Sequence, residues 1–273
     1  MQAGTERGRH LPAPPRSPTI GPSRAKVPGT STRAEGERTM IEVSWSIDHP
    51  ELLVGLVEAE GLSVAPANEE LGQALDLELA RCRGGGGPTA AVRQAIRDLL
   101  RRGGFKPTGR SKPASEYLAR AADEGNFPRI NNLVDINNLL SLRTGWPMSL
   151  VDLDRASVVP GESESGGTGE EARLEVRFGR PGESFVFNAA GQAIDVAGLV
   201  CLARRGGPPL ANPVKDSLAA KTVAETRRAL AVIYCSRQVA TTAEVAEIAQ
   251  EFEQLLQQHG GALRSCSRVL DGP

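Results

Sequence analysis

The sequence predicts an α+β domain, and three features of its organisation carry that prediction. Helix-like patterns fill the segment from residue 66 to residue 142, strand-like runs follow between residues 149 and 235, and one long helix-like segment occupies residues 242–259. Helices and strands that are segregated along a chain, and do not alternate, are typical of α+β architectures. The 273 residues could form one large domain or two small ones.

Residues 1–39 differ from the rest of the chain. They contain six prolines, five glycines and seven Lys or Arg against three Glu. Such a segment buries too little apolar area to offset the entropy of ordering it, so we expect it to be disordered. It lacks the apolar region of a secretory signal. Met40, a candidate start of the chain, opens "MIEVSWSIDHPELLVGLV", which predicts a strand followed by a helix.

Three helices are predicted next, at residues 66–80, 88–102 and 113–125. Between the first two lies "GGGG", which no G-K-[ST] follows, so a Walker A phosphate loop is excluded and a flexible turn is favoured. Pro113 is suited to the first turn of the third helix, and Gly125 is suited to its end.

The helix at "NNLVDINNLL", residues 131–140, has an unusual number of amides. Leu133, Ile136 and Leu140 recur as on a buried helical face. The polar positions are Asn131, Asp135 and Asn138, flanked by Asn132 and Asn137. One interpretation is a solvated face with Asn caps. However, solvated faces usually contain Glu, Lys and Arg, which favour helix more, so fixed hydrogen bonds to a neighbouring backbone or a ligand are the alternative.

The second half of the chain predicts strands and a final helix. The strand-like runs are 149–153, 173–178, 183–188, 195–203 and 228–235. A polar, glycine-rich segment at 158–172 predicts a mobile hairpin loop. The final helix has Thr242 as its expected N-cap and Gly260 as its stop, and its apolar stripe is expected to dock onto the sheet.

Composition and motifs exclude several functions. The 32 basic and 33 acidic residues nearly balance, and aromatics make up 4% of the chain, which argues against a general polyanion binder and against many stacking platforms. No apolar run approaches the roughly 20 residues that span a bilayer. No hydrolytic triad or metal motif surrounds the three histidines, His10, His49 and His259. Four scattered cysteines predict buried, reduced thiols: Cys82, Cys201, Cys235 and Cys266.

Two groups of polar residues remain as candidate sites. The first is basic, and its candidate phosphate contacts are Arg101, Lys106, Arg110 and Lys112. The last three lie in a loop that leads into a helix N-terminus, where free N–H groups and partial positive charge favour a phosphate. The second group is "NPVKDS", a turn between strands with Asn212, Lys215 and Asp216. A solvated surface is the alternative for the basic group.

The segment from Tyr117 to Ala156 resembles the B3/B4 domain of the phenylalanyl-tRNA synthetase beta chain. The elements that carry the resemblance are "INNLVDINN", the G-x-P-M turn at Gly145–Met148 and "DLDR" at Asp152–Arg155. A weaker similarity continues to about Ser236. The chain resembles the free-standing members of this group, in which upstream and closing helices accompany the domain.

The resemblance implies an α+β editing domain with a layered sheet and flanking helices, without a cofactor or a bound metal. In the synthetase this domain hydrolyses the ester of wrongly charged tRNA, and a "VD-x-x-N" helix lines its pocket. The residues implied for catalysis are Asn137, Asn138 and Ser149, and those implied for substrate binding are Asn131, Asp135, Asn138, Asn212, Lys215 and Asp216. The chain departs from the family pattern where Ser149 replaces a histidine and where Val232 replaces the acid that recognises tyrosine.

These observations favour a cytoplasmic protein that edits aminoacyl-tRNA in trans, with tRNA as partner and with neither membrane nor DNA involved. A non-catalytic RNA-binding module and a pocket for a free amino acid or small metabolite are the alternatives. The expected organisation is an extension at 1–39, a strand and helices at 40–112, a B3/B4-like domain at 113–236 and a closing helix with a tail at 237–273. The oligomeric state is left open.

Overall fold

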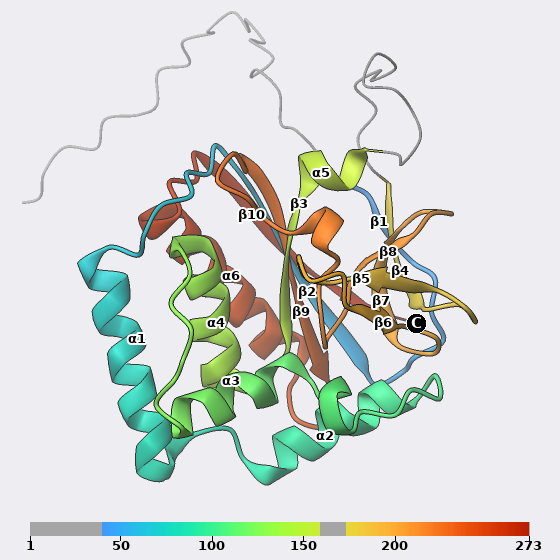
Figure 1. Cartoon of the computed structure of the whole chain (residues 1–273), viewed down its shortest axis with the longest axis horizontal. Helices are drawn as coiled ribbons and strands as arrows, with labels where there is room; N and C mark the ends of the chain where they lie inside the picture. The colour runs from blue at the N-terminus through green and yellow to red at the C-terminus, as the bar shows by residue number, and fades with distance from the viewer. Residues whose placement is uncertain (1–39, 159–172, 273) are drawn as a thin grey trace, which may run out of the picture. The chain divides into compact units, whose positions relative to one another are not determined.

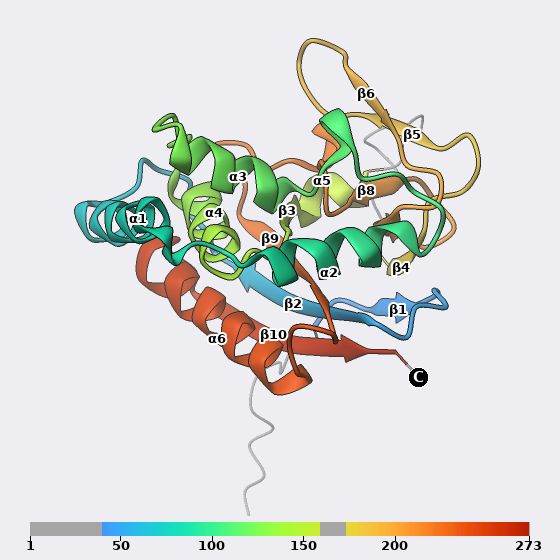
Figure 2. The same cartoon turned by 90° about the horizontal axis from the view of Figure 1, so that it is seen from below.

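The computed structural model of the protein describes residues 40–158 and 173–272 (Figure 1). The predicted extension at 1–39 lies outside the described residues, and so does nearly all of the predicted loop at 158–172. Within the described part, a helical layer, a central sheet and a second sheet lie side by side. Figure 2 shows α1, α4 and α6 on one side of the central strands, and β1 and β4 on the other. The predicted α+β class is confirmed.

The two larger sheets have four strands each, and a hairpin accompanies them. The central sheet has the order β10-β2-β9-β3, with β10 at Arg264–Asp271, β2 at Leu52–Glu60, β9 at Arg228–Ser236 and β3 at Met148–Asp152. The second sheet has the order β1-β4-β7-β8, with β1 at Val43–Trp45, β4 at Leu174–Phe178, β7 at Val200–Arg204 and β8 at Pro209–Ala211. The hairpin joins β5, Ser184–Val186, to β6, Ala193–Asp195.

The helices follow the predicted segments closely. They are α1 at Glu69–Arg81, α2 at Ala90–Arg101, α3 at Ala114–Asp123, α4 at Asn132–Thr144, the short α5 at Leu153–Ser157 and α6 at Thr242–His259. The "GGGG" segment forms the turn between α1 and α2, with Gly85 at φ 85°. The N-cap of α6 is Thr241, one residue before the predicted cap, and it forms a capping box with Glu244.

The first predicted helix, after residue 50, is a strand. Strand β2 pairs with β10 on one side and with β9 on the other, and eight of its nine residues are buried. A strand that is covered on both faces shows a continuous apolar run, and periodicity cannot distinguish such a run from a buried helix. The segment after α6, predicted as a tail, forms the edge strand β10 instead.

The strand boundaries between the hairpin and the second sheet also differ from prediction. The run at 195–203 contains two separate strands, because β6 ends at Asp195 and β7 begins at Val200. Gly198 lies between them at φ 71°, a backbone conformation that favours glycine. A side chain there would also meet the Gly103 carbonyl, so this glycine brings the loop after α2 close to the second sheet.

Helix α4 is buried on nearly all sides, and its amides do not form a solvated face. Asn132 is 3% exposed, and its side chain accepts from the Ala65 N–H at 3.0 Å and donates to the carbonyls of Ser63 at 2.9 Å and His259 at 2.7 Å. It therefore joins α4 to the loop after β2 and to the end of α6. The interpretation as a solvated face is wrong, because burial requires that amides find partners.

Candidate functional site

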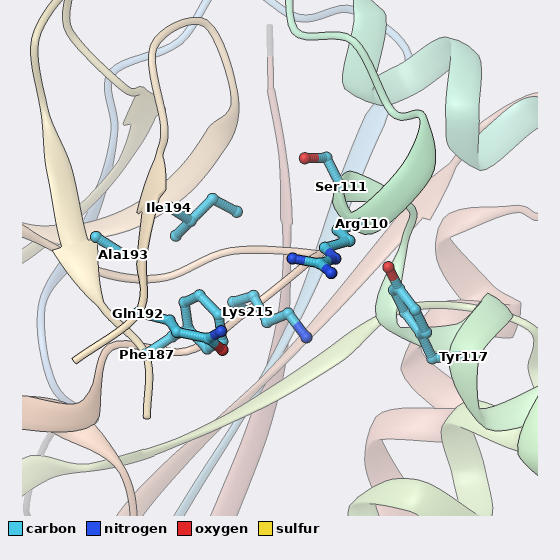
Figure 3. Close-up of a pocket in the computed structure, with 8 residues that line it drawn as sticks. All are labelled: Arg110, Ser111, Tyr117, Phe187, Gln192, Ala193, Ile194 and Lys215. Carbon is cyan, nitrogen blue, oxygen red and sulfur yellow. The ribbon is translucent and has the colours of Figure 1, made fainter. Parts of the chain in front are cut away.

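A cleft lies between the β5–β6 hairpin and the loop that joins α2 to α3. It consists of two adjoining cavities of about 550 and 340 Å³, which share Ser111, Ala193 and Ile194. The larger cavity is lined in addition by Arg110, Tyr117, Phe187, Gln192 and Lys215. The smaller one is lined in addition by Gly104, Phe105, Lys106, Asp195 and Ala197. Figure 3 shows the charged ends of Arg110 and Lys215 in the space between the loop and the hairpin.

The cations of this cleft are available to a ligand. Within the described residues, Lys106, Arg110 and Lys215 form no ion pair with a carboxylate. The Lys215 ammonium lies 5.0 Å from the centre of the Tyr117 ring and 5.1 Å from that of Phe187, within the range of cation–π attraction. Burial lowers the pKa of Lys215, and the positive charge of Lys221 lowers it further. An anionic group in the cleft would relieve that repulsion.

The turn after β8 fixes the position of Lys215. The Asn212 side-chain carbonyl accepts from the backbone N–H of Val214 at 2.8 Å and of Lys215 at 2.9 Å. The Pro213 carbonyl accepts from the backbone N–H of Ala114 at 2.9 Å. This last bond uses an N–H of the first turn of α3. The expected phosphate site at this helix N-terminus is therefore partly occupied by the protein's own backbone.

A buried polar cluster lies on the other side of the same turn. The Ser149 hydroxyl donates to the backbone carbonyl of Asn212 at 3.3 Å and lies against Asp216. Burial raises the pKa of the Asp216 carboxyl to about 6, although Ser149, Lys221 and two backbone N–H groups oppose the shift. The cluster therefore contains a carboxyl group whose pKa is raised by burial, beside a hydroxyl.

Strand β9 contributes Val232 and Tyr234 to this cluster. Ser149 pairs with Val232 in the register of β3 and β9, and residues two apart on a strand share a face, so Tyr234 lies on the same face. The Tyr234 hydroxyl is fully buried, beside Ser149, and makes no hydrogen bond within the described residues. Burial and the charge of Asp216 raise the pKa of Tyr234 well above its usual value.

The structure separates the asparagines of α4 by role. The Asn131 side chain caps the helix by accepting from the Val134 N–H, and Asp135 accepts from the Ile130 N–H at 2.9 Å. Asn137 and Asn138 are each 8% exposed and contact each other at 3.5 Å. The Asn137 side-chain oxygen has no partner in the described part of the chain. Neither amide lines the two cavities of the cleft.

The predicted cationic contacts also differ in whether they line the cleft. Lys106, Arg110 and Lys215 meet in the cleft, whereas Arg101 forms an ion pair with Asp98 and lines neither cavity. Lys112 also lies outside both linings. Sequence reasoning missed the three aromatic side chains of the cleft, because single aromatics in three separate segments give no local pattern.

Three of the four cysteines have buried thiols. Cys82, Cys201 and Cys235 are buried, whereas Cys266 on β10 is exposed, contrary to prediction. Burial raises the pKa of Cys201 and of Cys235 to about 12. Across residues 40–158 and 173–272, no helix is long and apolar enough to cross a membrane, and no three His, Cys, Asp or Glu side chains gather as metal ligands would.

The fold and cleft define an α+β domain with a cationic cleft that aromatic rings line. The sequence matches the B3/4 domain family over residues 102–258, more than half of its length, and the chain belongs to that family. The resemblance found in the sequence is thereby confirmed. No curated protein matches the chain.

Solved structures provide a further comparison. The chain is similar to a crystal structure of an N-terminal fragment of the phenylalanyl-tRNA synthetase beta-subunit from Pyrococcus horikoshii, with 9% sequence identity and a TM-score of 0.37. The similarity covers 85% of this chain and 52% of that fragment, so the chain spans about half the length of the fragment.

Proposed function

We propose that the protein binds the single-stranded 3′ end of aminoacyl-tRNA in the cleft and hydrolyses wrongly formed aminoacyl esters. The observation that carries the proposal is the set of cations in the cleft, Lys106, Arg110 and Lys215, none of which is neutralised by a carboxylate within the described residues. Phosphates are the natural partners of such cations, and the adjacent rings suit unstacked bases. Membership of the B3/4 family supports a role related to tRNA synthetases.

The chemistry requires positioning more than a strong nucleophile, because an aminoacyl ester is already activated. Water adds to the ester carbonyl carbon, the bond to the ribose oxygen breaks, and that oxygen takes the proton. Asn138 and Ser149 line neither cavity, and we assign them to hold the water or the carbonyl oxygen where the ester extends beyond the cleft. Asp216 lies against the Ser149 hydroxyl, and it is the carboxyl group that we assign to this step.

A binding module without hydrolysis is the second candidate. It is favoured by the linings of the two cavities, which contain no histidine and only one carboxylate, the exposed Asp195. Asp195 is therefore the only carboxylate of the two linings that could act as a general base, and we assign hydrolysis to the polar cluster beyond Lys215. The two candidates share RNA binding and differ only in turnover.

A panel of charged tRNAs separates the two candidates. Purified protein is incubated with tRNAs that carry serine, alanine, threonine or tyrosine, and release of each amino acid is measured. The proposal expects catalytic release of at least one of them, and the Ser149→Ala variant should lose it while still binding tRNA. Binding without release from any member of the panel would favour the non-catalytic module. A binding constant that does not depend on salt would contradict both, since phosphate contacts release counterions.

A further inference from the structure

The two cavities of the cleft repeat the same pair of chemical groups. The larger cavity has the cations Arg110 and Lys215 beside the rings of Tyr117 and Phe187. The smaller cavity has the cation Lys106 beside the ring of Phe105. One nucleotide needs both, since its phosphate is held by a cation and its base stacks on a ring.

The cavities also adjoin, as binding of one strand in both of them requires. Ser111 from the loop and Ala193 and Ile194 from β6 belong to both linings, so the two spaces meet at these three residues. Figure 3 shows Ser111 on the loop side and Ile194 with Ala193 on the hairpin side. Each volume falls within or near the range of pockets that hold a small ligand.

We infer that the cleft holds two successive nucleotides of one RNA strand, one in each cavity. The inference rests on the proposed function and gives it a substrate class, namely a single-stranded oligonucleotide of at least two residues. A free amino acid or a mononucleotide would fill only one of the two spaces. A duplex has its bases stacked inside and could offer none of them to Phe105 or Phe187.

Hydrogen-bonding groups in the cleft add a base preference. Asp195 in the smaller cavity has one carboxylate oxygen that accepts from the Ala197 N–H at 2.8 Å, and its other oxygen has no hydrogen-bond partner among the described residues. A carboxylate accepts from the exocyclic amino group of cytosine, whereas uracil offers an acceptor at that position. The negative charge of Asp195 repels a phosphate beside it, so the phosphate of this nucleotide is assigned to Lys106 in the same cavity.

The first test is the dependence of affinity on strand length. Fluorescein-labelled ribonucleotides of the sequences A, CA, CCA and ACCA are titrated with protein, and anisotropy gives each dissociation constant. Affinity should rise about 5- to 150-fold from A to CA, the range that stacking one more base contributes, and level off by CCA. The labelled dinucleotide UU should bind several-fold more weakly than CA. Equal affinity for A and CA would overturn the inference.

The second test uses charge-matched variants of exposed residues. Lys106→Gln should weaken CA but not A, and it should reduce the slope of log affinity against log salt by about 0.7, one phosphate contact to a single strand. Arg110→Gln should weaken both ligands. Arg227→Gln removes the same charge from an exposed arginine outside both cavities, and it should change neither. A Lys106→Gln variant that weakens A and CA equally would contradict two subsites.

The third measurement distinguishes this inference from the proposed function. Phe105→Leu keeps an apolar side chain against the core but removes the ring, and it should reduce the gain from A to CA to less than about 3-fold while the affinity for A is unchanged. If affinity does not depend on length while mischarged tRNA is still hydrolysed, two-nucleotide binding is wrong and the proposed function stands. If neither oligonucleotides nor tRNA bind, both are wrong.

Discussion

Asn132 offers a sharp test of how the protein uses its amides. Its side chain holds three segments together, since it contacts Ser63 and Ala65 after β2 and His259 at the end of α6, all at 2.7–3.0 Å. Replacement by alanine removes three hydrogen bonds between distant segments and leaves their backbone partners in a partly buried environment. At about 1 kcal/mol for each bond, the expected loss is about 3 kcal/mol of unfolding free energy.

The neighbouring residue provides a matched control. Asn131 is also an asparagine of α4, but its side chain only caps the helix. Asn131→Ala should therefore cost about 1 kcal/mol, the usual value of an N-cap. For a folded part of this size, each 1 kcal/mol lowers the melting temperature by about 2–4 °C. We expect Asn132→Ala to lower it by about 6–12 °C and Asn131→Ala by about 2–4 °C.

Thermal melts followed by circular dichroism, together with urea titrations, measure both variants under the same conditions. Equal shifts for the two variants would refute the reasoning, because they would show that the three long-range bonds of Asn132 contribute nothing beyond local capping. A large change in the urea m-value of Asn132→Ala would instead indicate that the variant alters the compactness of the folded or the unfolded state. The free energies of unfolding would then be compared at the midpoints of the urea transitions.

Three other outcomes are expected. Asn138→Ala should change the melting temperature by less than about 2 °C but lower ester hydrolysis at least tenfold, because within residues 40–158 and 173–272 this amide has only Asn137 as a hydrogen-bond partner, at 3.5 Å; a stability loss without an activity loss would make it structural. Burial raises the pKa of Asp216 to about 6, above its ordinary value, so the folded chain binds more protons than the unfolded chain between about pH 4 and pH 6. The free energy of unfolding should therefore fall as pH rises through that window, and Asp216→Asn should remove this fall in urea titrations. Parallel pH profiles of the two proteins would contradict this reasoning. Tyrosine-charged tRNA should be hydrolysed more slowly than tRNA charged with serine or alanine, because Val232, opposite Ser149, offers no acceptor for a phenolic hydroxyl; selective release of tyrosine would refute this.

The elements with a clear period and recognisable ends could be predicted from the sequence. Helix α3 lies between Pro113 and Gly125, and α4 begins after the cap Asn131 and ends at Gly145, whose φ is 75°. Local interactions define these ends, so the sequence contains the information. Strand β2 could not be predicted in the same way. Its identity depends on pairing with β9 and β10, which are distant in sequence.

The candidate site was predictable only in part for a related physical reason. Clustered charges such as Lys106 and Arg110 are visible in the sequence as a basic loop. The rings of Tyr117 and Phe187 are 70 positions apart, and only the hairpin of β5 and β6 brings Phe187 to the cleft. Tyr234 has an uninformative position in an apolar strand, and its role depends on the register that places it beside Ser149.

The turn with Lys215 and Asp216 connects the cleft, where we propose that RNA binds, to the polar cluster, where we propose that the ester is hydrolysed. This connection determines which variants can separate the two proposed roles. Lys215 lines the cleft, while the next residue, Asp216, contacts Ser149 in the polar cluster. A substitution at either position therefore disturbs both sites. Arg110 belongs only to the cleft, and Ser149 only to the cluster.

The pair Arg110→Gln and Ser149→Ala can therefore be compared in single-turnover and steady-state hydrolysis. Loss of a phosphate contact made equally in the ground state and the transition state raises KM and leaves kcat unchanged, whereas loss of a group that acts on the ester lowers kcat. We expect Arg110→Gln to show the first pattern and Ser149→Ala the second. The reverse assignment would mean that the ester lies in the cleft itself, and Asp195 would then be the carboxyl group closest to the chemistry.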